Sequence, residues 1–254
     1  MAAPHIAGAA ALLMQAGITD PLAVKAVLIN QADGGGWTPE FGWGYANLNA
    51  VAQRREYVKD TLAPATYRFY RGSTGGFFKS TLTWNRHIGT AGNGTTSFFN
   101  PLHLYLYSRG NNTLLFQSER PLDNVKQVGT SLNGEVVIKV KAGSANFVGV
   151  NPEAYALAFS AAGFTASSGP ALTAACTEPG AVPRGSSFAV NCELSNTGEL
   201  DAFSVTETMQ LPAGFAGENT QNAGTVAAGA RVLRTFQLTA PATGGSFTLT
   251  MNAA

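Results

Sequence analysis

The first thirteen residues constrain the fold most strongly, because they form a helical pattern that is apolar almost all round. Residues 1–13 read Met-Ala-Ala-Pro-His-Ile-Ala-Gly-Ala-Ala-Ala-Leu-Leu. A helix without a polar face belongs inside a large protein, with neighbours on every side. Pro4 is tolerated only in a first helical turn, where its missing N–H does no harm. We therefore expect a helix that begins at or just before Met1, where no capping Ser, Thr, Asp or Asn precedes it.

The same stretch carries a resemblance. Residues 1–8 resemble the segment that directly follows the nucleophile in subtilisin-like serine proteases (the peptidase S8 family), which read Gly-Thr-Ser-Met-Ala-(Ala/Ser)-Pro-His-(Val/Ile)-Ala-Gly. The motif residues here are Met1, Ala2, Ala3, Pro4, His5 and Gly8. The resemblance implies that the catalytic Ser, His and Asp and the oxyanion Asn all lie upstream of Met1. It also implies a structural role for His5, so we expect no catalytic residue in this chain and no activity from it alone.

Residues 1–62 are helical in pattern. Gly17 is a suitable stop for the first helix, and Asp20-Pro21 predicts the N-cap and first position of a second helix that reaches about Gln31. The later Gly42-Trp43-Gly44 stretch and the residues up to Val51 resemble the segment that closes the subtilisin domain. The resemblance thus covers about 55–60 residues and implies that 1–62 is the C-terminal remnant of an α/β catalytic domain.

Residues 63–163 change to short strand patterns separated by turn signals such as Asn133-Gly134. Such spacing predicts an antiparallel sandwich or jelly roll. The ordered set that begins with Leu82-Thr83-Trp84 and Leu102-His103-Leu104 resembles the jelly-roll domain appended to many bacterial subtilases. The expected strands are 67–71, 77–84, 102–108, 114–118, 124–129, 136–141 and 154–161.

Residues 164–254 are expected to form a third domain, an Ig-like sandwich of about 90 residues. The stretch 191–198, Asn-Cys-Glu-Leu-Ser-Asn-Thr-Gly, resembles a strand and turn of Ig-like repeats in bacterial secreted proteins. Cys176 and Cys192 lie on neighbouring strand patterns, where a disulfide would close a loop of about 15 residues and stabilise by about 3 kcal/mol. Two buried free thiols are the alternative. The expected strands are 171–177, 187–195, 203–210, 225–226, 231–239 and 246–251.

Composition excludes several classes of partner. Charged residues make up 12% of 254 residues and the net charge is +1, so we expect no nucleic-acid partner. No apolar run reaches the roughly 18 residues of a membrane span. A disulfide would fit an extracellular bacterial protein, with any secretion signal upstream of this chain.

The remaining candidate catalytic and metal-binding residues do not lie in recognisable sequence motifs. His87 and His103 lie in strand-like sequence, no Gly-x-Ser-x-Gly elbow is present, and Ser97 lies in what reads as a turn-rich loop. We expect no cofactor. The one metal site that we consider is Ca²⁺ on loops near Asp123 or Glu119, and solvated carboxylates are the alternative.

Two aromatic groups are candidates for ligand contacts. The first is Trp37, Phe41, Trp43 and Tyr45, which we interpret as the closing edge of the protease core. The second is Tyr67, Phe69 and Tyr70 together with the run 104–107, which we interpret mainly as core, because half of the residues of a strand face inward.

The sequence therefore predicts a mainly β chain: a short helical remnant of an α/β subtilisin domain, then two antiparallel β-sandwiches, a jelly roll and an Ig-like domain. We interpret it as the C-terminal part of a secreted subtilisin-like endopeptidase whose parent cleaves protein or peptide substrates. The alternative is a stand-alone β-sandwich module that binds carbohydrate, protein or a cell surface. Exposure of the region 1–60 would argue against the burial that the first interpretation requires.

Overall fold

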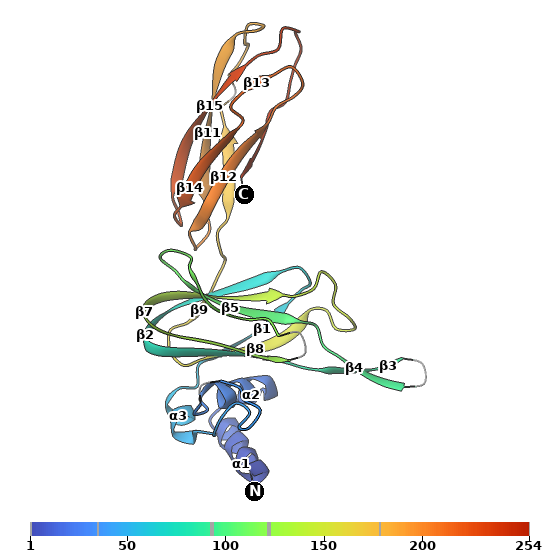
Figure 1. Cartoon of the computed structure of the whole chain (residues 1–254), viewed down its shortest axis with the longest axis vertical. Helices are drawn as coiled ribbons and strands as arrows, with labels where there is room; N and C mark the ends of the chain where they lie inside the picture. Colours follow the sequence, from blue (N-terminus) through green and yellow to red (C-terminus); the bar gives the residue numbers. More distant parts are fainter. Residues whose placement is uncertain (1, 35, 92–93, 121–122, 178, 254) are drawn as a thin grey trace. The chain divides into compact units, whose positions relative to one another are not determined.

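The computed structural model describes residues 2–34, 36–91, 94–120, 123–177 and 179–253. The chain forms two compact units, Met1–Ala166 and Ser167–Ala254. Three helices come first, and antiparallel sheets in sandwich-like arrangements follow (Figure 1). The predicted fold class, mainly β with N-terminal helices, is confirmed.

Helix α1 (Ala2–Gln15) ends where the sequence indicated. Gly17 has a φ of 97° and donates its N–H to Met14 O at 3.0 Å. The N–H of Ile18 reaches back to Leu13 O, also at 3.0 Å. These two bonds form a Schellman motif, and the buried side chains of Leu13 and Ile18 make the apolar contact that accompanies it.

Helix α2 (Pro21–Asn30) confirms the predicted second helix. The carboxylate of Asp20 caps it, accepting from the N–H groups of Leu22 at 3.0 Å and Ala23 at 3.1 Å. Helix α3 (Leu48–Gln53) starts in the same way, with Asn47 as its cap. Both helices thus begin at a polar residue that satisfies otherwise unpaired N–H groups.

A loop joins α2 to α3, and a turn within it brings residues 33 and 45 together. Asp33 and Tyr45 exchange two backbone hydrogen bonds of 2.8 and 3.0 Å. Gly44 lies between them with a φ of 100°, and a Cβ there would stand 2.1 Å from Asp33 O. Only glycine fits this close approach.

The first unit contains one seven-stranded antiparallel sheet, ordered β1-β8-β2-β7-β5-β6, with β9 also paired to β2. A separate two-stranded hairpin, β3–β4, projects from it (Figure 1). The strands are β1 (Tyr57–Leu62), β2 (Tyr67–Trp84), β3 (His87–Ala91), β4 (Gly94–Phe98), β5 (Leu102–Ser108), β6 (Leu114–Ser118), β7 (Val125–Ala142), β8 (Glu153–Phe159) and β9 (Thr165–Ser167).

Strands β2 and β7 are each 18 residues long and pair along almost their whole length. The expected strands 67–71 and 77–84 are therefore one continuous strand, β2. The expected strands 124–129 and 136–141 are likewise joined in β7. The predicted turn at Asn133-Gly134 is wrong: these residues pair with Gly75 and Thr74 inside the ladder. Glycines on both strands let them change direction together while their hydrogen bonds continue.

The long strands contribute to two layers around one core. Core side chains come from both halves of β2, including Tyr70 and Leu82, and from both halves of β7, including Val128 and Ile138. One layer consists of β1, β8 and the later half of β2, and α2 packs on its outer surface. Ala156 and Ala158 of β8 belong to the cluster that the helices bury.

Two further expectations for this unit are wrong. Residues 57–62 do not continue the helical pattern, because they form β1 and pair with β8. The stretch Gly94–Ser97 is not a turn-rich loop, because β4 includes it and pairs with β3. In both places pairing with a neighbouring strand decides the structure, which local sequence does not report.

The second unit is a sandwich of two antiparallel sheets, ordered β10-β11-β15-β13 and β14-β12-β16. Residues from both sheets form its core, among them Val190, Phe236 and Met209. The strands are β10 (Leu172–Cys176), β11 (Ser187–Asn196), β12 (Ala202–Gln210), β13 (Ala216–Gly217), β14 (Thr220–Val226), β15 (Arg231–Thr239) and β16 (Thr250–Ala253).

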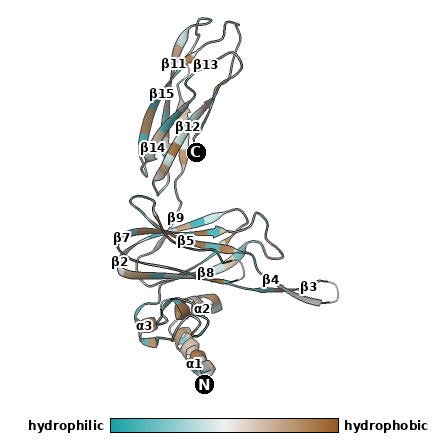
Figure 2. Ribbon diagram, in the orientation of Figure 1, coloured by the Kyte–Doolittle hydropathy of each residue, from teal (hydrophilic) through white to brown (hydrophobic). Residues whose placement is uncertain are grey.

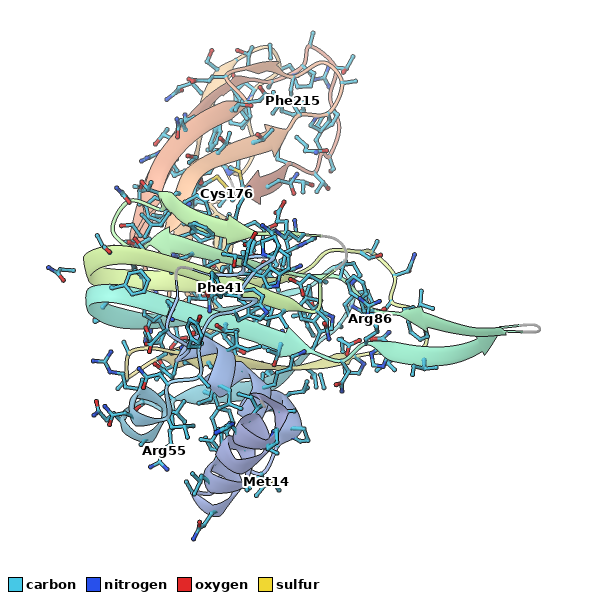
Figure 3. All side chains as sticks on the ribbon, turned by 60° about the horizontal axis from the view of Figure 1, so that its bottom comes forward. Met14, Phe41, Arg55, Arg86, Cys176 and Phe215 are labelled. Atoms are coloured by element: carbon cyan, nitrogen blue, oxygen red, sulfur yellow. A yellow bond between two sulfur atoms is a disulfide. The ribbon has the colours of Figure 1, made fainter. Side chains whose placement is uncertain are left out.

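A disulfide joins Cys176 of β10 to Cys192 of β11, which are directly opposite each other in the ladder. Cys192 is fully buried. Figure 3 labels Cys176 beside the yellow sulfur–sulfur bond. The bridge covalently ties the outer strand β10 to the rest of its sheet.

Glu207 of β12 is a carboxylate inside this sandwich. It alternates with the core residues Val205 and Met209 and has no exposed surface. Neither of its carboxylate oxygens has a hydrogen-bond partner, and the nearest cation, Arg234 Nε, lies 3.9 Å from Oε2. Burial raises the pKa of Glu207, and the charge of Arg234 opposes that rise.

We predict that reduction of the disulfide, or the double substitution Cys176→Ala and Cys192→Ala, lowers the unfolding free energy of the second unit by about 2–4 kcal/mol. The measurement is urea unfolding followed by far-UV circular dichroism. All three tryptophans precede residue 85, so tryptophan fluorescence reports only the first unit and serves as the internal control. An unchanged dichroism transition, or an equal shift in fluorescence, would contradict the prediction.

We also predict that Glu207→Gln stabilises the second unit at pH 7 by about 1–2 kcal/mol, because it removes a buried, unsatisfied charge. In the wild type, the folded state binds the carboxyl proton more tightly than the unfolded state. The unfolding free energy therefore falls as pH rises from about 4.3, the ordinary pKa, through the raised folded-state pKa.

Urea unfolding at pH 4 and pH 7 checks this. The wild type should lose stability over that interval, relative to the Gln variant. A Gln variant less stable than the wild type at pH 7 would mean that the attraction to Arg234 outweighs the cost of burial.

Candidate functional site

The subtilisin-like motif lies in the first turns of α1. Met1 lies outside the described residues, whereas Ala3, Pro4, His5 and Gly8 are all exposed. A Cβ on Gly8 would meet nothing within 4 Å. Among the motif residues whose exposure the structure describes, none is packed in the core of this unit.

The prediction that α1 is buried on every side is wrong for this structure. Ala9 and Leu13 are buried, and Leu13 packs in the cluster formed by α2, but Ile6, Leu12 and Met14 are 42%, 58% and 52% exposed. The apolar pattern of α1 predicts burial on more sides of the helix than the described residues cover. Figure 2 shows the hydrophobic colouring along α1 and α2.

An apolar groove runs between α1, α2 and the turn before α3. Its volume is about 460 Å³. Met14, labelled in Figure 3, is an exposed residue that lines the groove. The lining residues are Ile6, Ala10, Met14, Thr19, Pro21, Val24, Lys25, Leu28, Ile29, Ala32, Trp43, Gly44 and Ala46.

Lys25 brings a charge to this otherwise apolar lining. Burial lowers its pKa, and the negative charge of Asp123 opposes the shift. Asp123 also accepts from the N–H of Val125 at 3.0 Å, which fixes the start of β7. The groove thus offers apolar contact with a cation on its wall, and its lining contains no acid–base pair.

The aromatic group around this turn does not form the closing edge of a core here. Trp37, Phe41 and Tyr45 are 47%, 62% and 69% exposed, and Trp43 lines the groove. Phe41 and Tyr45 contact each other with ring centroids 5.9 Å apart. Our core interpretation of these four residues therefore does not describe this structure.

The second aromatic group divides between the two faces of its sheet. Tyr70, Leu104 and Leu106 are buried in the core, as interpreted. Tyr67 is half exposed, and Phe69, Tyr105 and Tyr107 are also on the outer face. The alternation of strand residues accounts for the division.

A buried polar cluster that the sequence did not reveal lies at the start of β8. His87 Nε2 is 2.8 Å from Glu153 Oε2, and Asn100 Nδ2 donates to the same oxygen at 2.7 Å. Asn100 also accepts from the N–H of Val148 at 2.8 Å and donates to Val150 O at 3.0 Å. These bonds hold the loop before β8, which makes the cluster structural.

The remaining predicted candidates are not brought together. His103 is on β5, and burial lowers its pKa. Glu119 is exposed and accepts a hydrogen bond from Tyr105 Oη. The side chain of Ser97 lies outside the described residues. Among the side chains that the structure describes, no three His, Cys, Asp or Glu gather closely enough to hold a metal ion.

Residues 1–44 match the subtilase family, Peptidase_S8. This match covers α1, α2 and the turn that lines the groove. No curated protein matches the chain. In the described part of the chain, no helix is long and apolar enough to cross a membrane.

Solved structures that align with the chain include two with low sequence identity and low TM-scores. The CUB1-EGF-CUB2 region of human MASP-1/3 is 7% identical with a TM-score of 0.22, and the alignment covers 78% of this chain and 99% of that one. The exo-chitosanase CsxA of Amycolatopsis orientalis, in complex with PNP-β-D-glucosamine, is 11% identical with a TM-score of 0.19. That alignment covers 72% of this chain and 20% of the chitosanase.

We predict that the groove binds apolar dyes such as ANS, because its exposed walls are apolar and contiguous. The double substitution Ile6→Gln and Met14→Gln should reduce the dye's fluorescence enhancement by about half or more. Leu233→Gln is the matched control, since Leu233 is 66% exposed on the second unit. An enhancement that the double variant leaves unchanged would locate the dye elsewhere.

Proposed function

We propose that this chain is the C-terminal part of a subtilisin-like serine endopeptidase, in which residues 1–53 complete the catalytic domain. The observation that carries the proposal is the subtilase match over residues 1–44, on helices that leave an apolar groove open. In the proposal, the rest of the catalytic domain covers this groove. The exposure of Ile6, Leu12 and Met14 is what such a cover would remove.

In this proposal, the nucleophilic serine directly precedes Met1, at the N-terminus of the fourteen-residue helix α1. The unpaired N–H groups and positive dipole end of such a helix favour negative charge near them. A helix start is therefore a favourable position for an attacking oxygen and for the oxyanion that forms next to it.

The reaction would be that of a Ser-His-Asp triad. The serine attacks the peptide carbonyl while the histidine takes its proton and then gives it to the leaving amine. Water hydrolyses the resulting acyl ester in a second step. All triad members are supplied by sequence before Met1, so the chain by itself should not cleave peptides.

The two β units would then be accessory domains of a secreted enzyme. Jelly-roll and Ig-like identities are part of this proposal, supported by the antiparallel sheets around two separate cores. The disulfide between Cys176 and Cys192 supports an extracellular location, because such bonds persist in oxidising compartments.

The test is to isolate the protein from the organism that makes it, with an antibody against residues 167–254, and to treat it with a tagged fluorophosphonate. This reagent labels activated serine nucleophiles. We expect labelling, and a labelled tryptic peptide in which a serine directly precedes the Met-Ala-Ala-Pro-His sequence. Heat-denatured protein is the control.

A native protein whose first residue is Met1, and which the reagent does not label, would overturn the proposal. The stand-alone binding module would then be the better interpretation.

A further inference from the structure

The first unit carries rings and lysines on the outer surface of the layer that the helices do not cover. Alternate residues of β2, β7 and β5 point outward from this layer and form cross-strand rows. One row runs Tyr67–Lys141–His103 and the next Phe69–Lys139–Tyr105. We call the set Tyr67, Phe69, Tyr105, Tyr107, Lys139 and Lys141 the aromatic face.

The rings form two columns on either side of the lysines. Tyr67 and Phe69 of β2 have centroids 5.1 Å apart, and Tyr105 and Tyr107 of β5 have centroids 6.3 Å apart with their planes inclined by 25°. Neighbouring strands are about 4.8 Å apart, so the two columns are separated by about 10 Å. The result is two columns of rings on either side of the strand that carries the two lysines, with the planes of Tyr67 and Phe69 inclined by 57°.

Neither lysine is neutralised by a carboxylate among the described residues. Lys139 Nζ lies 4.8 Å from the ring centroid of Tyr67 and 5.6 Å from that of Phe69, so the ammonium group makes cation–π contacts with both rings. Burial, and then the charge of Lys141, lower the pKa of Lys139. A bound anion would relieve this unfavourable pair of like charges.

The hydroxyl groups of Tyr105 and Tyr107 keep their protons, and that of Tyr105 is already bonded to Glu119. Burial raises the pKa of both Tyr105 and Tyr107, and the neighbouring Glu119 raises them further. Both side chains are therefore neutral at ordinary pH. Tyr105 donates to Glu119, which sets the direction of its ring.

We propose that the aromatic face binds an acidic polysaccharide built of uronic acids. Sugar rings would lie on the tyrosine rings, which offer an apolar face with a polar tip. The carboxylates of the same sugars would pair with the ammonium groups of Lys139 and Lys141. This proposal rests on the sheet alone and does not require the helices to belong to a protease.

A uronic-acid polymer fits this face better than a protein partner. Protein interfaces centre on well-packed apolar anchors in pockets. The aromatic face is open and has hydroxyl and ammonium groups among its rings, with the carboxylate of Glu119 bonded to Tyr105 beside it. Its unpaired cations complement the negative charge that every residue of such a polymer carries.

The experiment is isothermal titration of the full chain with a galacturonic-acid hexamer. A neutral malto-oligosaccharide of the same length and a glutamate hexapeptide are the comparison ligands. We expect binding of the uronate alone. The double substitution Lys139→Gln and Lys141→Gln should raise its Kd about tenfold, and Tyr105→Ala should raise it about fivefold.

Two variants are matched controls. Arg55→Gln removes an exposed cation, and Phe77→Ala removes a ring that is 63% exposed at the bend of β2. Neither should change the Kd. Far-UV dichroism checks that every variant folds, and Tyr105→Phe, which keeps the ring, should retain most of the affinity.

Three results would overturn the proposal. They are no binding of the uronate, equal binding of the glutamate peptide, and a Kd that the lysine or Tyr105→Ala variants leave unchanged. These variants touch no residue of the subtilase-like segment, so the outcome is independent of the fluorophosphonate test.

Discussion

The first unit depends on the continuous pairing of β2 with β7. Their ladder runs from Tyr67 opposite Lys141 to Thr83 opposite Val125, and both strands bend where Thr74, Gly75 and Gly76 face Gly134, Asn133 and Leu132. Thr74 Oγ1 donates to Leu132 O at 2.5 Å within this bend, so a side chain supports the backbone where the strands turn. Because each strand passes through both layers, the register of this one ladder sets the register of both layers, and β8 and β5 pair with its two edges.

The sequence predicted most strand positions, and the reason is alternation. Strands β5, β6 and β15 begin and end at the expected residues, because their apolar residues alternate between clear turn signals. The joined strands β2 and β7 could not be predicted, since glycine and Asn-Gly pairs are also the strongest signals for a turn. Whether such a pair ends a strand or bends it depends on the facing strand, which is far away in the sequence.

For the candidate site, the ends of the helices could be predicted from the sequence, but the residues that pack around the helices could not. Asp20 and Gly17 fixed the helix ends through local hydrogen bonds, which a short window of sequence contains. The burial of α1 could not be predicted in this way. An apolar pattern indicates that a surface can be buried, but it does not identify the residues that pack on it. The pair of His87 and Glu153 was also hidden, because 66 residues separate its two members and each is an ordinary polar residue in its own segment.

The two outer surfaces of the first sandwich differ in side-chain size, and this difference decides what can cover each one. Under the helices the sheet presents Ala156, Ala158, Thr81 and Thr83, which are small enough for α2 to approach closely. The threonine hydroxyls then bond to the helix itself, Thr83 to Leu22 O and Thr81 to Asn30 Oδ1, each at 2.9 Å. On the aromatic face, rings and lysines stand at the corresponding outward positions and would hold a helix away from the backbone. A ligand for that face must therefore lie on the rings, which favours a thin, ring-shaped and charged molecule over a packed secondary-structure element.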